Sequence, residues 1–277
     1  MTVALVTGAS SGIGEAIAVQ LASQGIQTFG AARGIVKMEK LLAAGGTALS
    51  LDLTLPASID ECIEQVIAKA GRIDILVNAA GTALYGAIED VSFEDARTHF
   101  DVNLFGAAAL IQKVAPLMRA QRAGHILNIS TVGGVVASPY GGWYHATKFA
   151  LEGMSSSLRQ ELNPFGVNVV VIRPEAIRSG WRAIAGATLL ENSGEGPYKV
   201  AARAMHDKYM SAGFEKMLAD PDVVAKLVAR IIASKRPKSV YLVPFMAKVT
   251  LTLVSLMGSD RLRDAFVRKF IGLPRTL

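Results

Sequence analysis

The sequence is poor in cysteine and in leader-like features. Cys62 is the only cysteine among 277 residues, so no internal disulfide can form, and a reducing compartment is indicated. The first residues run from Met1 into an apolar segment and reach Gly8 without a basic region or a long apolar stretch before a cleavage site. No secretory signal is visible, and we expect a cytoplasmic protein.

Charged residues are also scarce, at 19%, whereas apolar residues make up 51% of the chain. This balance excludes a disordered chain. The length suffices for one large α/β domain or two small domains. His99, His125, His145 and His206 show no ligand spacing with Cys62 or with carboxylates, so we expect no metal site.

The net charge of +6 is confined to one end of the chain. Residues 234–277 hold nine lysines and arginines against two aspartates, while the rest holds 20 basic and 21 acidic residues. A protein that binds nucleic acid would carry a basic surface on its main body. We therefore expect no nucleic-acid partner.

A glycine-rich loop follows the first apolar run. Residues 2–7 are typical of a strand buried on both faces, and Gly8, Gly12 and Gly14 lead into a helical pattern. A strand, a glycine-rich turn and a helix N-terminus together form an anion-binding site. Gly8 allows the tight turn, and the other two glycines allow close approach of a pyrophosphate. On its own such a loop is a weak signal, and a purely structural turn is the alternative.

Tyr144 and Lys148 lie four residues apart in a helical pattern, so they share one face of that helix. A tyrosine hydroxyl has a pKa of about 10 and is by itself a poor acid or base at neutral pH. A nearby lysine ammonium favours the phenolate and lowers this pKa, so that the pair can exchange a proton with an alcohol oxygen. The alternative for such a pair is a solvent-exposed helix face.

The order T-G-x-x-x-G-x-G at residues 7–14, together with Tyr144 and Lys148, resembles the short-chain dehydrogenase/reductase family over roughly residues 2–245. The resemblance implies a Rossmann-type, doubly wound α/β domain over residues 1–245, with a substrate lid at about 180–213. Its seven parallel strands should follow the order 3-2-1-4-5-6-7. The apolar runs predict these strands at 2–7, 27–32, 48–53, 73–77, 125–131, 167–172 and 239–243.

The end of the second strand bears on the coenzyme. Ala32 stands where the family often has an aspartate that binds the ribose hydroxyls of NAD, and Arg33 follows directly. Because a guanidinium can pair with a 2′-phosphate, the residues and the resemblance both favour NADP(H). A solvated arginine at a strand end is the alternative.

Further cofactor contacts are implied by the resemblance alone. Asp52 matches the residue at the adenine edge, the Asn-Ala-Ala-Gly turn at residues 78–81 matches the turn beneath the adenine, and Ser179 matches the threonine that contacts the nicotinamide amide. The predicted cofactor-binding residues are Gly8, Ser10, Ser11, Gly12, Ile13, Gly14, Arg33, Asp52, Leu53, Asn78, Ala79, Ala80, Gly81, Tyr144, Lys148, Pro174, Ile177 and Ser179.

The predicted catalytic residues are Asn103, Thr131, Tyr144 and Lys148. The resemblance makes Asn103 the residue that holds a water in a proton relay, and it requires a hydroxyl that binds the substrate carbonyl 13 residues before the tyrosine. That count gives Thr131 and not Ser130, and only one of two neighbouring strand residues can face the site. We assign the role to Thr131.

Glu175 departs from the family pattern, which has a glycine at this position after the sixth strand. A glycine there can require a positive φ, which puts the course of this loop in doubt. An ionised carboxylate that points inward would favour the oxidised nicotinamide. A side chain facing solvent, or paired with Arg173 or Arg178, is the alternative.

Residues 246–277 form an extension beyond the resemblance. Residues 240–257 are strongly apolar but contain Pro244 and Lys248, which argue against a membrane-spanning helix, and residues 260–270 have a basic amphipathic pattern. One interpretation is an extension packed beside the lid. The other is a contact with a membrane surface through a basic face.

The resemblance implies an NADP(H)-dependent oxidoreductase that interconverts a secondary alcohol and a ketone, or an aldehyde. The extension favours a hydrophobic substrate, and a homodimer or homotetramer is expected. An acyl-carrier-protein ketoreductase is one alternative. A protein that senses NADP without turnover is the other.

Overall fold

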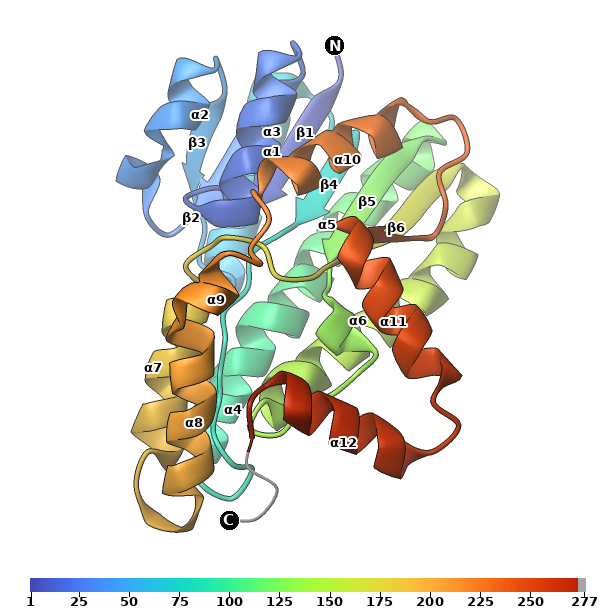
Figure 1. The fold of residues 1–277 in the computed structure, drawn as a ribbon. Helices are drawn as coiled ribbons and strands as arrows, with labels where there is room; N and C mark the ends of the chain where they lie inside the picture. Colours follow the sequence, from blue (N-terminus) through green and yellow to red (C-terminus); the bar gives the residue numbers. More distant parts are fainter. Residues whose placement is uncertain (274–277) are drawn as a thin grey trace.

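The computed structural model describes residues 1–273, so residues 274–277 of the predicted extension, with Arg275, lie outside the described part. Its centre is a parallel sheet of seven strands in the order β3-β2-β1-β4-β5-β6-β7, as predicted (Figure 1). The strands are β1 (Val3–Thr7), β2 (Gln27–Ala32), β3 (Thr47–Ser50), β4 (Ile75–Asn78), β5 (Gly124–Ile129), β6 (Val167–Pro174) and β7 (Val240–Val243).

Strand β1 shows why the sheet lies inside the molecule. All five of its residues are buried, and their side chains alternate between two apolar clusters: Ala4 and Val6 belong to one cluster, and Val3 and Leu5 to the other. Alternation follows from the two-residue period of a strand. A strand with apolar residues on both sides requires helices on both faces of the sheet.

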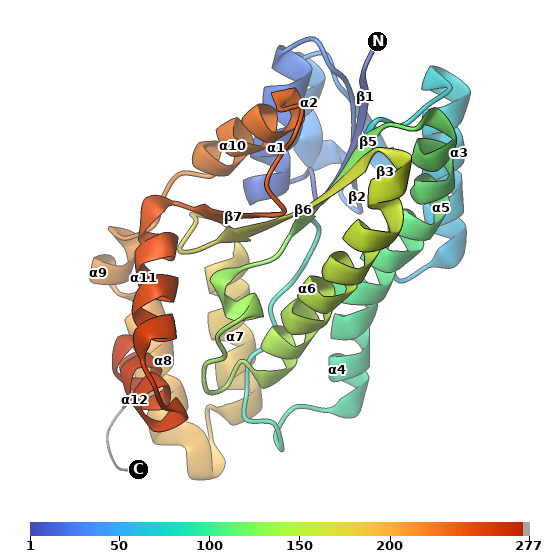
Figure 2. The ribbon, with the colours of Figure 1, turned by 90° about the vertical axis from the view of Figure 1, so that its right-hand side faces the viewer.

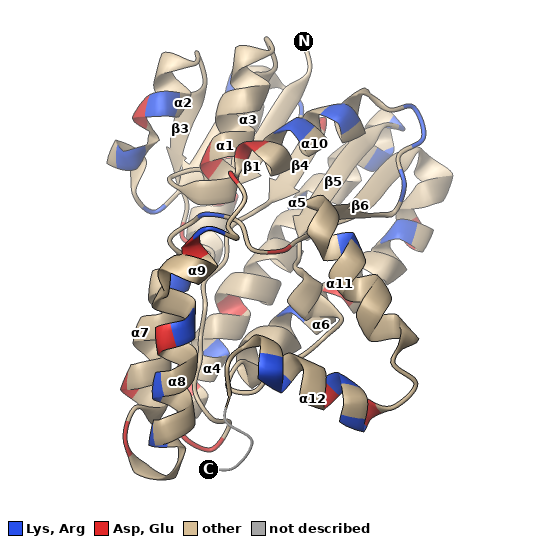
Figure 3. Cartoon of the chain, viewed as in Figure 1, with Lys and Arg blue, Asp and Glu red and all other residues tan. Residues whose placement is uncertain are grey.

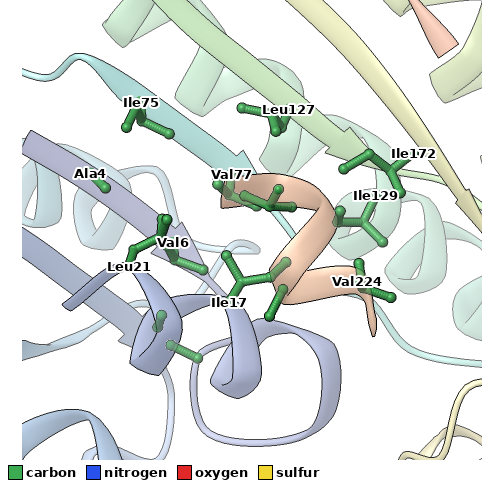
Figure 4. Packing of buried hydrophobic residues seen from close by; sticks show 14 of the residues in the cluster. Ala4, Val6, Ile17, Leu21, Ile75, Val77, Leu127, Ile129, Ile172 and Val224 are labelled. Atoms are coloured by element: carbon green, nitrogen blue, oxygen red, sulfur yellow. The ribbon is translucent and has the colours of Figure 1, made fainter. Parts of the chain in front are cut away.

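One face is covered by α1 (Gly12–Ser23), α10 (Asp222–Ala233) and α2 (Glu39–Ala43), the last preceded by η1 (Ile35–Met38). Ile17 and Leu21 of α1 and Val224 of α10 point into the cluster beside Val6 and Val77 of the sheet (Figure 4). The other face is covered by α3 (Pro56–Ala70), α5 (Gly106–Gln121) and α6 (Gly142–Leu162). Helix α4 (Phe93–Phe100) leads through a π-helical turn, η2 (Asp101–Phe105), into α5.

Two predicted strands end earlier than expected. Strand β3 stops at Ser50, because the Asp52 carboxylate accepts hydrogen bonds from the backbone and side chain of Thr54 and forms a turn there. Strand β5 stops at Ile129. Thr131 then caps the short helix η3 (Val132–Gly134) by accepting a hydrogen bond from the Gly133 amide, so it lies beyond the strand.

The lid and the extension are helical. The residues predicted to form the lid, about 180–213, lie in α7 (Trp181–Ser193), η5 (Gly196–Tyr198), α8 (Lys199–Met210) and the start of α9 (Ala212–Glu215). After β7 the chain forms α11 (Phe245–Leu256) and α12 (Asp260–Phe270), which lie on the lid side of the molecule (Figures 1 and 2). The remaining short helix is η4 (Asn163–Phe165). Within residues 1–273, no helix has the length and apolar character needed to cross a membrane.

Candidate active site

The glycine-rich loop lies at the carboxyl end of β1, where the strand order reverses between β1 and β4. Gly8 has φ +70°, and a Cβ there would lie 2.8 Å from the Ala80 Cα. A Cβ on Gly14 would lie 2.3 Å from the Gly8 carbonyl oxygen. Both positions therefore exclude a side chain, because the loop packs against the turn at residues 78–81 and the first turn of α1 packs against the loop. This feature fits a dinucleotide.

The two turns of this crevice are tied together. The Thr7 hydroxyl accepts hydrogen bonds from the amides of Ala79 (3.1 Å) and Ala80 (3.0 Å), which fixes the turn at residues 78–81 against the glycine-rich loop. Asn78 itself donates to Asn128 Oδ1 at 2.8 Å inside the core. The side chain of Asn78 therefore supports the sheet, and the backbone of the turn forms the crevice.

Arg33 and Asp52 lie near one another beyond the ends of β2 and β3. Hydrogen bonds from Thr54 lower the pKa of the Asp52 carboxyl, and the Arg33 guanidinium lowers it further. Arg33 is exposed, so its guanidinium is accessible to a ligand phosphate. Leu53 follows Asp52 and packs closely against Gly106 of α5. The charge and position of Arg33 fit a 2′-phosphate at this edge.

The remaining predicted cofactor residues lie around the same loop. Ser11 precedes α1 and makes no side-chain capping bond, and a Cβ on Gly12 would lie 3.0 Å from the Ser179 Cβ. Ile13 packs on the core, and Ile177 forms a parallel bridge with Ala219. Ser10 lies in the loop itself. The loop after β6 thus approaches the glycine-rich loop, as a cofactor held between them requires.

Thr131 and Tyr144 face each other. Burial raises the pKa of the Tyr144 hydroxyl, and a hydrogen bond with the Thr131 side chain opposes that rise. The Thr131 hydroxyl also donates to the Pro174 carbonyl oxygen at 3.2 Å. A carbonyl oxygen placed between the two hydroxyls would be within reach of both.

Ser130 points elsewhere. Its side chain is 4% exposed, and its hydroxyl oxygen is buried without a hydrogen-bond partner among the described residues. A Cβ on Gly134 would lie 2.5 Å from that oxygen. This arrangement favours Thr131 as the carbonyl-binding hydroxyl, although the role itself stays a prediction.

Lys148 lies below Tyr144 in the same helix, α6. Its Nζ donates to the Ile129 carbonyl oxygen at 3.1 Å. Burial lowers its pKa to about 8, against an opposing effect of the Glu152 carboxylate. The sequence predicted that Lys148 lowers the pKa of Tyr144, but in the structure the pKa of Tyr144 is raised, because loss of water around the phenol dominates.

Asn103 is buried at the π-helical turn. Its Nδ2 donates to the Thr82 carbonyl oxygen (3.1 Å), and its Oδ1 accepts from the Thr82 amide (2.9 Å). A Cβ on Gly81 would lie 3.2 Å from Asn103 Oδ1 and 3.7 Å from Lys148 Nζ. Gly81 therefore separates the two side chains. The position suits the predicted relay, whose water-holding step stays a prediction.

His99 is a residue that the sequence prediction missed. Its Nε2 lies 3.1 Å from Asn103 Nδ2, and its Nδ1 is buried without a partner among the described residues. Burial, together with a smaller effect of the Lys148 charge, lowers the pKa of His99 to about 4. His99 thus stays neutral and accepts a hydrogen bond from Asn103. The four-residue spacing from Asn103 on one helix face was the available signal.

Aromatic side chains cover Tyr144. Its ring centroid lies 5.5 Å from Trp181 and 5.8 Å from Tyr85, and Tyr209 packs 6.2 Å from Trp181. Tyr144 is only 8% exposed as a result. A hollow of about 420 Å³ lies nearby against Tyr140, and Tyr144 is not among its lining residues. No pattern in the sequence indicated these aromatic partners.

The loop after β6 corrects the expectation for Glu175. Arg173 pairs with Glu152 (2.8 Å), and Arg178 lies 3.5 Å from Glu215, so neither arginine pairs with Glu175. The Glu175 side chain is half-buried and makes a hydrogen bond with Thr250 of α11, and burial raises its pKa. It therefore faces the extension. Its predicted effect on the oxidised ring has no support here.

The left-handed residue of this loop is Ala176, with φ +49°. Among the described residues, the others with positive φ that are not glycine are Arg122 and Tyr140. The positive φ that a glycine adopts readily thus occurs at residue 176, and not at residue 175 where the family has its glycine. Glu175 itself needs no glycine-like conformation.

The chain is similar to known oxidoreductases. The family model described as short chain dehydrogenase matches residues 2–188. A 3-ketodihydrosphingosine reductase of Bacteroides thetaiotaomicron is 33% identical, over 88% of this chain and 86% of the relative. Retinol dehydrogenase 8 of Homo sapiens is 34% identical, over 84% of this chain and 78% of the relative.

Solved structures share the fold. A metagenomic short-chain oxidoreductase in complex with NADP is 30% identical and superposes with a TM-score of 0.68. The match covers 87% of this chain and 96% of that structure. That structure holds NADP, and this chain carries an arginine, Arg33, directly after β2.

Proposed function

The chain belongs to the short-chain dehydrogenase family and is an oxidoreductase that uses a nicotinamide cofactor, and on this premise we propose that it interconverts a hydrophobic alcohol and its ketone or aldehyde with NADP(H). The observation that carries the proposal is the placement of Thr131 opposite Tyr144, with Lys148 beneath and aromatic side chains above. The cofactor, when bound, supplies or accepts the hydride.

In the proposed reaction, side chains of this protein bind the carbonyl oxygen of the substrate and transfer a proton to it. Thr131 donates a hydrogen bond to the substrate carbonyl oxygen, and Tyr144 transfers the proton to it in the direction of reduction. Lys148 has a pKa of about 8, which is close to neutral pH, so its ammonium can resupply that proton. Asn103 lies on the Nζ side of Lys148, where it would hold the water of the proton relay.

A hydrophobic substrate is supported by the wall of the site. The cluster that contains Tyr144 is otherwise apolar or aromatic, with members from the lid and the extension: Ala83, Tyr85, Ala185, Leu189, Ala201, Ala202, Met205, Tyr209, Ile271 and Leu273. The names of the two relatives above point to lipidic molecules as well. A pocket of this composition favours an apolar ligand with few polar groups.

Two further points belong to the proposal. Exposed Arg33 supports NADP(H) over NAD(H). The single and buried Cys62 supports a reducing compartment, for which we propose the cytoplasm, and a homodimer or homotetramer stays our expectation for the assembly. The division between residues 1–245 and the extension is likewise a proposal.

The test is a screen of hydrophobic ketones, aldehydes and alcohols with NADPH or NADP, followed by the absorbance of the reduced nicotinamide. Tyr144→Phe removes only the hydroxyl, so cofactor affinity should persist while turnover falls by about 10²–10⁴. Near-normal turnover in Tyr144→Phe would contradict the mechanism.

Two other outcomes would redirect the proposal. Turnover confined to β-ketoacyl thioesters would indicate an acyl-carrier-protein ketoreductase. Tight NADPH binding without turnover of any substrate, in the wild type as in Tyr144→Phe, would indicate a sensor.

A further inference from the structure

Helix α11 carries an apolar row on its outward side. Phe245, Met246, Leu253 and Leu256 recur at helical spacing and are between 48% and 76% exposed. The opposite side, with Ala247 and Val254, is buried against the body of the protein. Helix α11 is apolar on both faces but buries only one of them. An exposed apolar face of this kind is typical of a surface that contacts an apolar partner.

Helix α12 adds a second row. Leu262, Phe266 and Phe270 follow one another at intervals of four residues, and the rings of the last two stack at 6.4 Å. Leu262 is 59% and Phe270 43% exposed. None of the residues of α12 is fully buried.

Basic side chains lie on the same two helices as the apolar rows, and three of them, Lys248, Arg261 and Lys269, are exposed. Residues 245–273 contain Lys248, Arg261, Arg263, Arg268 and Lys269 against two aspartates, and α11 contains no acidic residue. In Figure 3, α12 carries blue segments (Lys, Arg) together with red ones (Asp). Apolar rows flanked by basic side chains are typical of helices that lie in the surface of an anionic bilayer.

We propose that the outward faces of α11 and α12 form a docking surface for a membrane that contains anionic lipid. A second copy of the chain fits this surface less well. A two-fold contact would place the same basic segment of each copy against that of the other, and like charges in an interface are unfavourable. Anionic headgroups complement the lysines and arginines, and acyl chains take up the apolar rows.

The docking surface is connected to the active site. Ile271 and Leu273, which follow α12 directly, are 4% and 9% exposed and belong to the same cluster as Tyr144 and the lid residue Leu189. A membrane that holds α12 therefore lies beside the apolar wall of the substrate site. This link to substrate delivery rests on the function proposed above, whereas the docking surface does not.

The test is sedimentation of the full chain with vesicles of phosphatidylcholine, with and without phosphatidylglycerol. We expect the wild type to sediment with the anionic vesicles and much less with the neutral ones. The double variant Leu253→Glu/Leu256→Glu should lower the partition coefficient by at least about tenfold, and so should Lys248→Gln/Arg261→Gln/Lys269→Gln. Leu42→Glu, at an exposed position on α2, is the matched control and should sediment like the wild type.

Three results would overturn the proposal: no binding of the wild type to anionic vesicles, equal binding to both vesicle types, or wild-type binding by the double variant. Size-exclusion chromatography with light scattering tests the alternative that a second copy of the chain covers this surface. A wild type that ignores vesicles but forms a dimer lost in Leu253→Glu/Leu256→Glu would assign the surface to a second copy. Binding to vesicles is independent of turnover, so an inactive protein that sediments would contradict only the function proposed above.

Discussion

The indole ring of Trp181 lies 5.5 Å from the phenol ring of Tyr144, and this contact joins the first turn of α7 to the residue that we propose transfers the proton. The contact helps to bury Tyr144, and burial is the largest cause of its raised pKa. Burial thus keeps Tyr144 protonated, which is the form that the proposed reduction requires.

The first prediction concerns this contact. Trp181→Ala removes apolar surface from the substrate wall, so the KM for a hydrophobic ketone should rise by about tenfold or more, as expected for the loss of roughly 50 Å² or more of buried apolar contact. Trp181→Phe keeps an aromatic ring and should change KM much less. Steady-state kinetics with one bulky and one small ketone measure both effects. A KM that is unchanged in Trp181→Ala would place the substrate elsewhere.

The second prediction separates the two neighbouring hydroxyls. Thr131→Ala removes a donor to the carbonyl oxygen and should lower kcat by about 10²–10³, as does loss of one oxyanion donor in other enzymes. Ser130→Ala should retain activity, because its hydroxyl is buried without a partner among the described residues. Thr131→Ser restores the hydroxyl and should recover most of the rate. The reverse ranking of the two alanine variants would show that the strand end was assigned one residue out of register.

Much of this architecture could be predicted from the sequence, because it depends on local chemistry. Apolar runs give the strands, and Gly8 and Gly14 stand where a Cβ would strike backbone atoms. The spacing of Tyr144 and Lys148 places both on α6. These features need no knowledge of distant residues.

The electrostatics of the site could not be predicted in this way. The direction of the Tyr144 pKa shift depends on burial by Trp181 and Tyr209, which lie far along the chain in the lid. Likewise, Glu175 faces Thr250 because α11 packs over the loop, and nothing near Glu175 in the sequence indicates that. Tertiary packing determined both outcomes.

The third prediction tests the coenzyme at Arg33. Loss of a charged hydrogen bond in Arg33→Ala should cost about 1.5–3 kcal/mol in NADPH binding, which raises its KM by roughly 10- to 150-fold. The KM for NADH should hardly change. Lys69→Ala, which removes an exposed charge from α3, serves as the control. Equal effects of Arg33→Ala on both coenzymes would give Arg33 a structural role.

The fourth prediction concerns the loop after β6. Because Ala176 has φ +49°, Ala176→Gly should stabilise the fold by about 1 kcal/mol, read as a rise in Tm. Ala137→Gly, at an exposed loop position without positive φ, should give no such rise. Glu175→Gly should not tighten NADPH binding in isothermal titration, because Glu175 needs no such freedom. Tighter binding would mean that the carboxylate does oppose the cofactor.

The fifth prediction is a pH dependence of stability that originates at His99. Its pKa is about 4 in the folded chain and 6.5 as its ordinary value, which we take for the unfolded chain. Between these two values the unfolded chain binds a proton at this position and the folded chain does not. Stability therefore falls as the pH decreases from 6.5 toward 4, by up to about 3 kcal/mol from this group.

His99→Gln isolates that contribution. Glutamine offers an oxygen that can accept the hydrogen bond of Asn103, but it does not titrate. His125 and His145, whose pKa values burial also lowers, remain in both proteins, so their effects cancel in the comparison. The Tm of the wild type should drop more steeply than that of His99→Gln between pH 6.5 and 4. Parallel Tm curves would mean that His99 binds its proton at the same pH in the folded and the unfolded chain. Asn103 would then lose its neutral hydrogen-bond acceptor as the pH falls through that value.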